Sequence, residues 1–394
     1  MTSIAQQAHR HQPQVIECHD CSLPLHIPGL QHKQEAHCPR CGLEITSFHQ
    51  STVDYILAYS FTALLFLFAT VPFLFLSFSV KDQYQQIDIV KSLTTLVNYN
   101  YIVLASLEII AIFIIPFIIL CGLIYLLIPI RLTRSPPPFS AIILRLIFVL
   151  LPWSMAEIFL IGTLVSLVKI TSLADVSLGM SFYAFVFFSI FMVATSARLD
   201  KIQLHKLLKI TPHHSLKKKP YSKQYTWALL ITALILYIPA SLLPIMTTRL
   251  LGHDDPSTIL GGVERLWQHG SYPIAIVIFI ASILIPIAKI IALAWLNYSV
   301  QTKSNVHHKH RMIIYRVAEF LGRWSMIDVF VVTILVSLIQ LGNTMSVYPG
   351  PAAFAFSGVV IITMLAAMSF DSHLIWCPDK NQINNRRNNG NTSS

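Results

Sequence analysis

The sequence predicts an all-α polytopic membrane protein, with two parallel repeats of four transmembrane helices and a small N-terminal zinc ribbon. The 394 residues are 54% hydrophobic and only 12% charged, whereas soluble globular domains carry roughly 25% charged residues. The phrase WSMAEIFLIGTLVSLV at 153–168 returns as WSMIDVFVVTILVSLI at 324–339. Two C-x2-C pairs lie within the first 50 residues. These observations predict the membrane class, the duplication and the ribbon in turn.

The segment 1–50 contains a predicted metal site. Sixteen residues separate the pair Cys18 and Cys21 from the pair Cys38 and Cys41. Each pair places two thiolates on one tight turn, and two turns complete a tetrahedral shell of four sulfurs. Two disulfides or a redox pair are the alternatives, which a cytosolic location disfavours. We expect a structural zinc ion, with iron as the less favoured metal, because four protein ligands leave no open position.

Apolar runs long enough to cross a bilayer, about 20 residues each, follow the ribbon. Pro116 lies within the second run and Pro286 within the sixth, and a proline in a spanning helix usually marks a kink. We place eight spans, near 55–79, 101–130, 153–170, 179–197, 226–248, 272–298, 324–341 and 351–370.

The two halves of the chain align with each other at an offset of 170 or 171 residues. Pro116 then meets Pro286, and Gly179 meets Gly350. We therefore predict two copies of one four-helix unit. The expected divisions are a ribbon at 1–50, a first unit at 51–200, a basic linker at 201–223, a second unit at 224–378 and a disordered tail at 379–394.

Basic residues predict the orientation of the chain. Because each unit has an even number of spans, both units enter and leave on one side, which makes the repeats parallel. The stretch Arg198–Lys223 alone contains eight of the 28 Lys and Arg residues. By the positive-inside rule, this linker, the ribbon and both termini are expected to be cytoplasmic. The net charge of +10 gathers in short gaps between apolar runs, which argues against nucleic acid as a partner.

Two ionisable residues within predicted spans occur in one half each. Lys289 lies in the sixth span, and Glu108, in the second, aligns with Ile278. A lysine at the bilayer centre costs roughly 2.5–3.5 kcal/mol on insertion scales. Lys289 therefore either extends its ammonium toward the cytoplasmic interface or lines a polar cavity, where it meets a lipid phosphate or a carboxylate.

Further charges lie near the ends of spans. Glu157 and Asp328 occupy the same position of the repeated phrase, which suggests a structural role in both units, with a proton relay as the alternative. Lys169 and Asp175 flank the far end of the third span. A surface ion pair explains them, and contact with a lipid headgroup is the sharper hypothesis.

Motifs for enzymatic chemistry are absent from the sequence. It contains no G-x-x-x-x-G-K-[ST] phosphate loop, no H-E-x-x-H and no G-x-S-x-G. We expect a protein that is not an enzyme, whose work is driven by a gradient, by a partner or by downhill movement of its ligand.

With these features assembled, the chain resembles the paraquat-inducible protein A family. The resemblance implies an inner-membrane protein of Gram-negative bacteria that works with a periplasmic MCE-domain tunnel partner and moves phospholipids between membranes. It also implies a second cysteine ribbon ahead of the fifth span, and 204–225 contains no cysteine. The matching segments are CHDC…CPRCG, TILGGVERLWQHGSYPIA, ASILIPIAK, RWSMIDVFVVTILVSLIQLG, PGPAAFAF and AAMSFDSHLIW.

The resemblance leads to one favoured expectation and two alternatives. The favoured one is a lipid transport component that loads or receives lipid for the tunnel partner, with Lys289 and the pair Lys169 and Asp175 as headgroup contacts. A non-transporting membrane anchor or assembly scaffold is the first alternative. A stress sensor that uses the ribbon thiols is the second.

Overall fold

A computed structural model provides the fold of the chain. Residues 209–221 of the predicted linker and the predicted tail 379–394 lie outside the part it describes. The described residues are 14–18, 20–27, 34–47, 52–80, 83–98, 101–133, 135–171, 175–208, 222–250, 253–268, 270, 272–302, 308–338 and 345–376.

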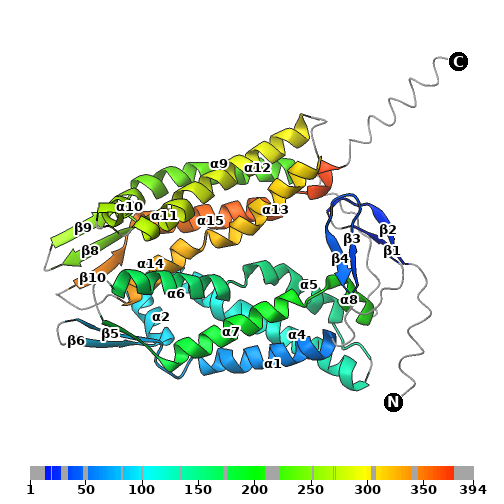
Figure 1. Cartoon of the computed structure of the whole chain (residues 1–394), viewed down its shortest axis with the longest axis horizontal. Coiled ribbons are helices and arrows are strands. Elements are labelled where there is room, and N and C mark those ends of the chain that lie inside the picture. Colours follow the sequence, from blue (N-terminus) through cyan, green and yellow to red (C-terminus); the bar gives the residue numbers. More distant parts are fainter. Residues whose placement is uncertain are drawn as a thin grey trace.

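The first half is mainly helical, with short strands gathered at one end (Figure 1). Strand β5 pairs antiparallel with both β6 and β7. In order the elements are α1 (Thr52–Ala69), β5 (Leu76–Val80), β6 (Gln83–Ile87), α2 (Ile89–Asn98), α3 (Ile102–Ile109), a π-helical turn (Ile110–Ile114), α4 (Ile115–Thr133), α5 (Ser140–Leu150), a 3-10 turn (Leu151–Trp153), α6 (Ala156–Thr171), β7 (Asp175–Leu178), α7 (Met180–Ala197) and α8 (Lys201–Leu207).

The second half presents corresponding elements in the same order. Strand β8 pairs antiparallel with both β9 and β10. The elements are α9 (Ser222–Leu242), β8 (Met246–Leu250), β9 (His253–Ser257), α10 (Ile259–Gln268), α11 (Tyr272–Phe279), a π-helical turn (Ile280–Leu284), α12 (Ile285–Gln301), α13 (His308–Trp324), α14 (Ile327–Leu338), β10 (Met345–Pro349), α15 (Pro351–Ser369) and a 3-10 turn (Ser372–Ile375).

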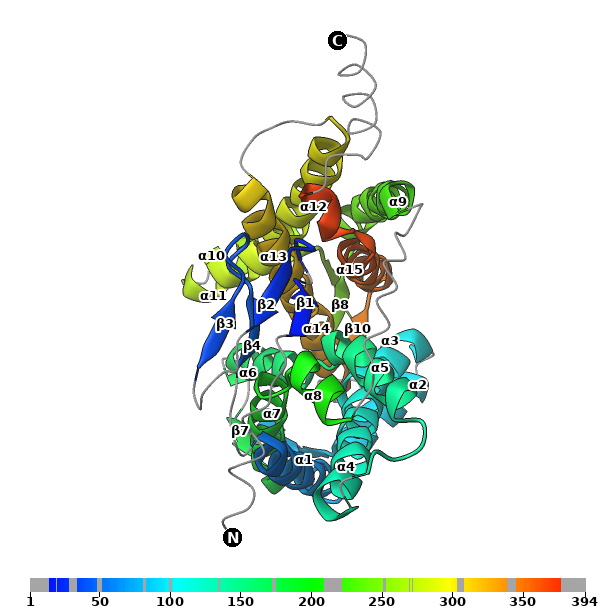
Figure 2. The same cartoon turned by 90° about the vertical axis from the view of Figure 1, so that its right-hand side faces the viewer.

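The ribbon consists of two antiparallel hairpins. They are β1 (Gln14–Glu17) with β2 (Pro24–Ile27), and β3 (Glu35–His37) with β4 (Glu44–Ser47). Figure 1 shows the ribbon at the end opposite the two three-stranded sheets. Figure 2 views the molecule from this end, with the ribbon between the two halves.

The expectation of an all-α fold is too simple, because each half carries a three-stranded sheet. Strand β5 occupies the end of the predicted span 55–79, where α1 stops at Ala69. Serines and large apolar residues alternate over 76–80, and such a period of two favours a strand over a helix. The predicted linker 201–223 likewise begins with a helix, α8.

Seven helical stretches within the described residues are long and apolar enough to cross a membrane, by length and composition. The predicted span 324–341 corresponds to α14, whose 12 residues end at Leu338, where this described stretch of the chain stops. The seven stretches are Thr52–Ala69, Ile102–Leu132, Ser140–Leu167, Met180–Ala197, Ser222–Leu242, Ile280–Gln301 and Pro351–Ser369.

The two aligned prolines each follow a wider turn of helix. Pro116 and Pro286 are the second residues after the π-helical turns at 110–114 and 280–284. A proline has no N–H to donate, and its ring crowds the carbonyl four residues earlier, which a wider turn relieves. Both halves therefore carry an irregular turn of helix beside the aligned proline.

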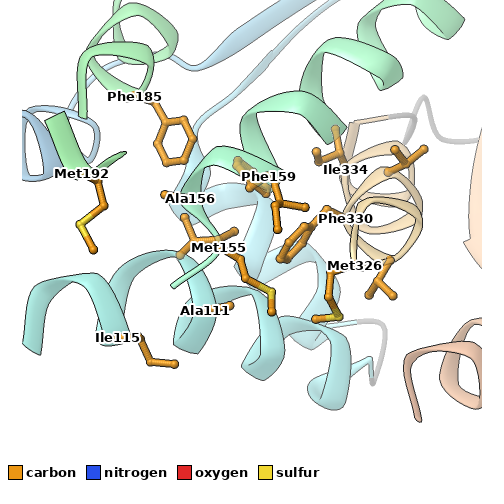
Figure 3. Packing of buried hydrophobic residues seen from close by; sticks show 14 of the residues in the cluster. Ala111, Ile115, Met155, Ala156, Phe159, Phe185, Met192, Met326, Phe330 and Ile334 are labelled. Atoms are coloured by element: carbon orange, nitrogen blue, oxygen red, sulfur yellow. The ribbon is translucent and has the colours of Figure 1, made fainter. Parts of the chain in front are cut away.

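The two halves meet where α6 packs against α14. A Cβ atom on Gly162 would lie 3.2 Å from Cβ of Phe330, so the two helices approach closely at this glycine. The rings of Phe159 and Phe330 meet edge to face, with 5.6 Å between centroids. Figure 3 shows these rings beside Met155 and Met326. One continuous apolar core therefore spans both halves.

Two ion pairs hold the β8–β9 hairpin in the second half. The guanidinium of Arg249 donates to both oxygens of Asp254, at 2.6 and 3.0 Å. Arg265 on α10 binds Asp255 in the same two-pronged way, at 2.5 and 2.7 Å. Hydrogen bonds from these arginines lower the pKa of Asp254 and of Asp255 below the ordinary aspartate range.

We expect the hairpin to loosen in acid. An aspartate whose pKa is lower in the folded state stabilises the fold above its unfolded pKa, about 3.9, and this contribution is lost as the pH falls through the folded pKa. Hydrogen exchange of 246–257 should therefore show less protection as the pH falls below this value. In an Arg249→Gln, Arg265→Gln variant the pH dependence should be smaller. Equal pH dependence in both proteins would contradict the prediction.

Gly350 lies where β10 leads into α15. Its N–H donates to the carbonyl of Ile245 at 2.8 Å, and a Cβ atom there would lie 2.0 Å from the carbonyl oxygen of Pro244. At the aligned Gly179 the corresponding distance, to the carbonyl oxygen of Leu74, is 1.9 Å. Only glycine lets the backbones approach this closely at either position.

The substitution Gly350→Ala is therefore expected to destabilise the protein by about 1–3 kcal/mol, the usual cost of overpacking, because backbone atoms must move. Gly262→Ala is the matched control, since no atom lies within 4 Å of its added Cβ. Thermal unfolding in detergent measures both variants. If Gly350→Ala melts at the same temperature as wild type or Gly262→Ala, the close backbone contact does not require glycine at position 350.

Candidate metal centre and buried charges

The four ribbon cysteines lie on two similar turns. The N–H of Cys18 donates to the carbonyl of Leu23 at 3.0 Å, and that of Cys38 to Leu43 at 2.8 Å. Each turn ends on a residue with left-handed backbone geometry, Ser22 with φ 53° and Gly42 with φ 71°. The chain thus builds the same thiol-presenting turn twice.

The sulfur positions fit a tetrahedral metal ion. Sγ of Cys18 lies 3.5 Å from Sγ of Cys41, and Sγ of Cys21 lies 3.5 Å from Sγ of Cys38. All four sulfurs lie within 4.8 Å of one another. Zinc–sulfur bonds of about 2.3 Å require about 3.8 Å between sulfurs, whereas a disulfide requires about 2.05 Å. The arrangement is compatible with a metal site formed by four thiolates.

The surroundings of the thiols differ in their effect on acidity. Burial acts to raise the pKa of Cys38, but hydrogen bonds from the backbone N–H groups of Cys41 and Arg40 oppose it, and the pKa is lowered to about 7. For Cys21, burial dominates and raises the pKa. Cys38 is thus converted to a thiolate ligand more readily than Cys21 near neutral pH.

The ribbon contacts the second half through polar side chains. Arg316 on α13 donates to Oδ2 of Asp20 from Nη2 at 2.8 Å and from Nε at 3.2 Å. Ser22 Oγ lies 2.5 Å from Nδ1 of His373. The sequence analysis did not predict this contact between Asp20 and Arg316. The position of Asp20 between two metal-binding cysteines was the available signal.

A second set of contacts ties the ribbon to the first half. Thr46 on β4 donates a hydrogen bond to Asp200. The other carboxylate oxygen of Asp200 accepts the backbone N–H of Ile202 at 2.8 Å and so caps α8. The ribbon therefore contacts both halves at the same end of the molecule, as Figure 2 shows.

Lys289 is buried among helices of the second half, with 2% of its surface exposed. Its Nζ donates to Oγ1 of Thr363 on α15 at 3.0 Å. A Cβ atom on Gly322 of α13 would lie 2.9 Å from the same Nζ. Three helices, α12, α13 and α15, thus enclose the ammonium. The contact with Thr363 was not predicted, because no local pattern links positions 289 and 363.

Glu108 is the buried charge of the first half. It is 2% exposed, and its Oε2 has no hydrogen-bond partner within the described part of the chain. Its aligned position, Ile278, is apolar, and the position aligned with Lys289 is the buried Ile119. Glu108 and Lys289 are therefore buried ionisable side chains without an ionisable counterpart in the other half.

The repeated acids lie in the first turns of the central helices α6 and α14. At this end of a helix the backbone N–H groups and the macrodipole favour negative charge. Glu157 also experiences the positive charge of Arg323 on α13, from the other half. Positions 157 and 328 are brought to the contact between the halves.

The pair Lys169 and Asp175 is only partly covered by the structure. Their backbones belong to α6 and β7. Their side chains lie outside the described part. The ion pair or headgroup contact expected of them stays a prediction.

Apolar helices of membrane-spanning length define a multi-pass membrane protein. Its N-terminal ribbon carries four clustered cysteines, an arrangement compatible with a metal site. The family model described as paraquat-inducible protein A matches residues 53–209 and again residues 223–378. The chain belongs to this family.

Two relatives align with nearly the whole chain, and a third aligns with part of it. Intermembrane transport protein PqiA of Escherichia coli K12 is 35% identical over 410 residues, covering 93% of this chain and 97% of the relative. Lipophilic envelope-spanning tunnel protein A of the same organism is 27% identical, covering 94% and 92%. A probable intermembrane transport protein of Haemophilus influenzae is 41% identical over 153 residues, or 39% of this chain and 37% of the relative. No solved structure matches the chain.

We expect the purified protein to carry one zinc ion per chain. Cys21→Ser should lose nearly all of it, because a closed site needs all four thiolates. Cys121→Ser should keep it, since this half-buried residue lies in α4, away from the ribbon. Elemental mass spectrometry measures the metal. A full equivalent of zinc in Cys21→Ser would remove the basis for the site.

Proposed function

We propose that this protein is the inner-membrane component of an intermembrane lipid transport system. In this proposal it loads or receives lipids for a periplasmic MCE-domain tunnel partner, and it is not an enzyme. Two relatives support this proposal. They are named as an intermembrane transport protein and an envelope-spanning tunnel protein, and each aligns with more than nine-tenths of the chain.

The proposed topology has eight crossings in two parallel units, 51–200 and 224–378. The separate family matches, the common element order and the aligned π-helical turns support the duplication. The ribbon 1–50 and both termini would lie in the cytoplasm, as would the linker 201–223, and the two sheets in the periplasm. The density of Lys and Arg in the linker supports this orientation.

The buried Lys289 is the observation that carries the proposal. An ammonium at membrane depth is costly to insert, and residues that carry one there usually serve a function. Within the described residues, Lys289 has a neutral hydroxyl, that of Thr363, as its hydrogen-bond partner. A cation bonded to a neutral group retains the capacity to bind an anion such as a lipid phosphate. We propose this role for Lys289.

Other residues receive supporting roles in the proposal. Lys169 and Asp175, near the periplasmic side, would contact headgroups. Glu157 and Asp328 would hold each unit in place at the cytoplasmic interface. The ribbon metal would be structural zinc rather than iron, and it would fold a segment too small to be stable by its apolar core alone.

We expect Lys289→Met to abolish complementation of a deletion strain under envelope stress, because methionine fills similar volume without charge. A photo-crosslinking residue in place of the partly buried Ile283 should capture about tenfold less lipid in this variant, the usual effect of losing a charge-assisted hydrogen bond. Lys91→Met, on the exposed surface of α2, is the control.

The alternatives predict other results. Wild-type growth and lipid capture in Lys289→Met would end the headgroup role. A scaffold that passes no lipid would give no lipid adduct at any buried position. A thiol sensor would lose its response in Cys18→Ser while the protein still accumulates and is inserted.

A further inference from the structure

A cavity of about 300 Å³ lies between the two halves, near the ribbon. Leu151 and Pro152 of the first half form one side. Helices α13 and α15 of the second half form the others. Ligand sites in proteins usually measure about 300–1,000 Å³, so this cavity has room for a headgroup, while longer chains must extend outside it.

The charged wall of the cavity is one face of α13. Arg316, Glu319 and Arg323 line it, and a spacing of three and four residues places side chains on the same side of a helix. Gly322 also lines the cavity, and the ammonium of Lys289 lies directly behind it. Guanidinium groups bind phosphate through two parallel hydrogen bonds, which favours them wherever phosphate is recognised.

The facing wall is apolar and adaptable. Met364 and Met368 of α15 line it together with Phe320 of α13. Methionine side chains are flexible and polarizable, so they adapt to ligands of irregular shape. The cavity is therefore amphipathic, with guanidinium groups on one side and thioether and aromatic groups on the other.

The outer surface of α13 indicates what surrounds the cavity. Ile313, Val317, Phe320 and Trp324 form a row at helical spacing that is 55%, 50%, 54% and 36% exposed. An exposed apolar row beside a charged face is the pattern of a helix at a membrane interface. Phe320 belongs both to this row and to the cavity, so acyl chains can pass from one to the other.

The charges around the cavity select the kind of headgroup. Arg316 already has an acidic neighbour, Asp20, and Glu319 adds a carboxylate to the wall. A purely anionic ligand would meet these carboxylates unfavourably. A ligand that carries both a phosphate and an ammonium group complements both signs.

We propose that this cavity binds the headgroup of an aminophospholipid from the cytoplasmic leaflet, with the phosphate on Arg323 and Arg316 and the ammonium on Glu319. The acyl chains lie along the apolar row of α13. The site deepens the proposed function, on which its part in transport rests. Its occupancy by lipid can be measured without transport.

The test uses the full-length protein in nanodiscs of phosphatidylethanolamine and phosphatidylglycerol in equal amounts. Phe320 is replaced by p-benzoylphenylalanine, and lipid adducts are quantified by mass spectrometry after irradiation. Adducts at 320 should favour phosphatidylethanolamine. The same residue in place of Phe61, 62% exposed on α1, should report the bulk composition.

Matched variants separate the contributions. Arg323→Gln should lower adducts at 320 about tenfold, as expected for a lost charged hydrogen bond. Glu319→Gln should remove the preference for phosphatidylethanolamine. Met368→Trp keeps every charge but fills the cavity, and should lower adducts as well. Arg145→Gln, at the exposed position that aligns with Arg316, should leave them unchanged.

The site is overturned if adducts at 320 match the bulk composition and respond to neither Arg323→Gln nor Met368→Trp. Adducts at 320 that behave as expected, together with no lipid adduct at position 283, would retain the site and reject the proposed transport role.

Discussion

The need to pair every backbone N–H and C=O within the chain governs this architecture, because an apolar surrounding offers no water to replace a missing bond. Helices meet this need within one segment, and the seven long apolar stretches are helices. Where Pro116 and Pro286 remove a donor, each helix widens by a π-helical turn. Strands occur only at the two ends of the described molecule, within hairpins and three-stranded sheets, where hydrogen bonds to neighbouring strands satisfy most of their backbone.

The ribbon adds a second constraint at one end. Its two thiol turns fit one metal ion, and its edges reach both halves through Asp20 and Thr46. A metal that orders these turns also orders Asp20, and Asp20 positions Arg316 at the cavity between the halves. Polar contacts therefore join the ribbon to both halves, between residues 154 and 296 positions apart along the chain.

The two halves share an order of elements but not their buried charges. Glu108 lies in the first and Lys289 in the second, and isoleucines occupy the aligned positions. Such asymmetry gives two similar scaffolds different chemistry: the second half encloses a cation beside a hydroxyl, whereas the first encloses a carboxyl group. The proposed lipid contacts accordingly concentrate in the second half and at its contact with the first.

Composition, the repeated phrase and the cysteine spacing determined the membrane class, the internal similarity and the thiol cluster, because these depend on local patterns and on ligand geometry. The end of α1 at Ala69 was also open to prediction, from the alternation at 76–80. Tertiary structure alone decided that Asp20 binds Arg316, that Thr363 meets Lys289 and that α6 crosses α14 at Gly162. These contacts join residues 74 to 296 positions apart or lie between helices, and helix packing, which no local pattern encodes, brings them together.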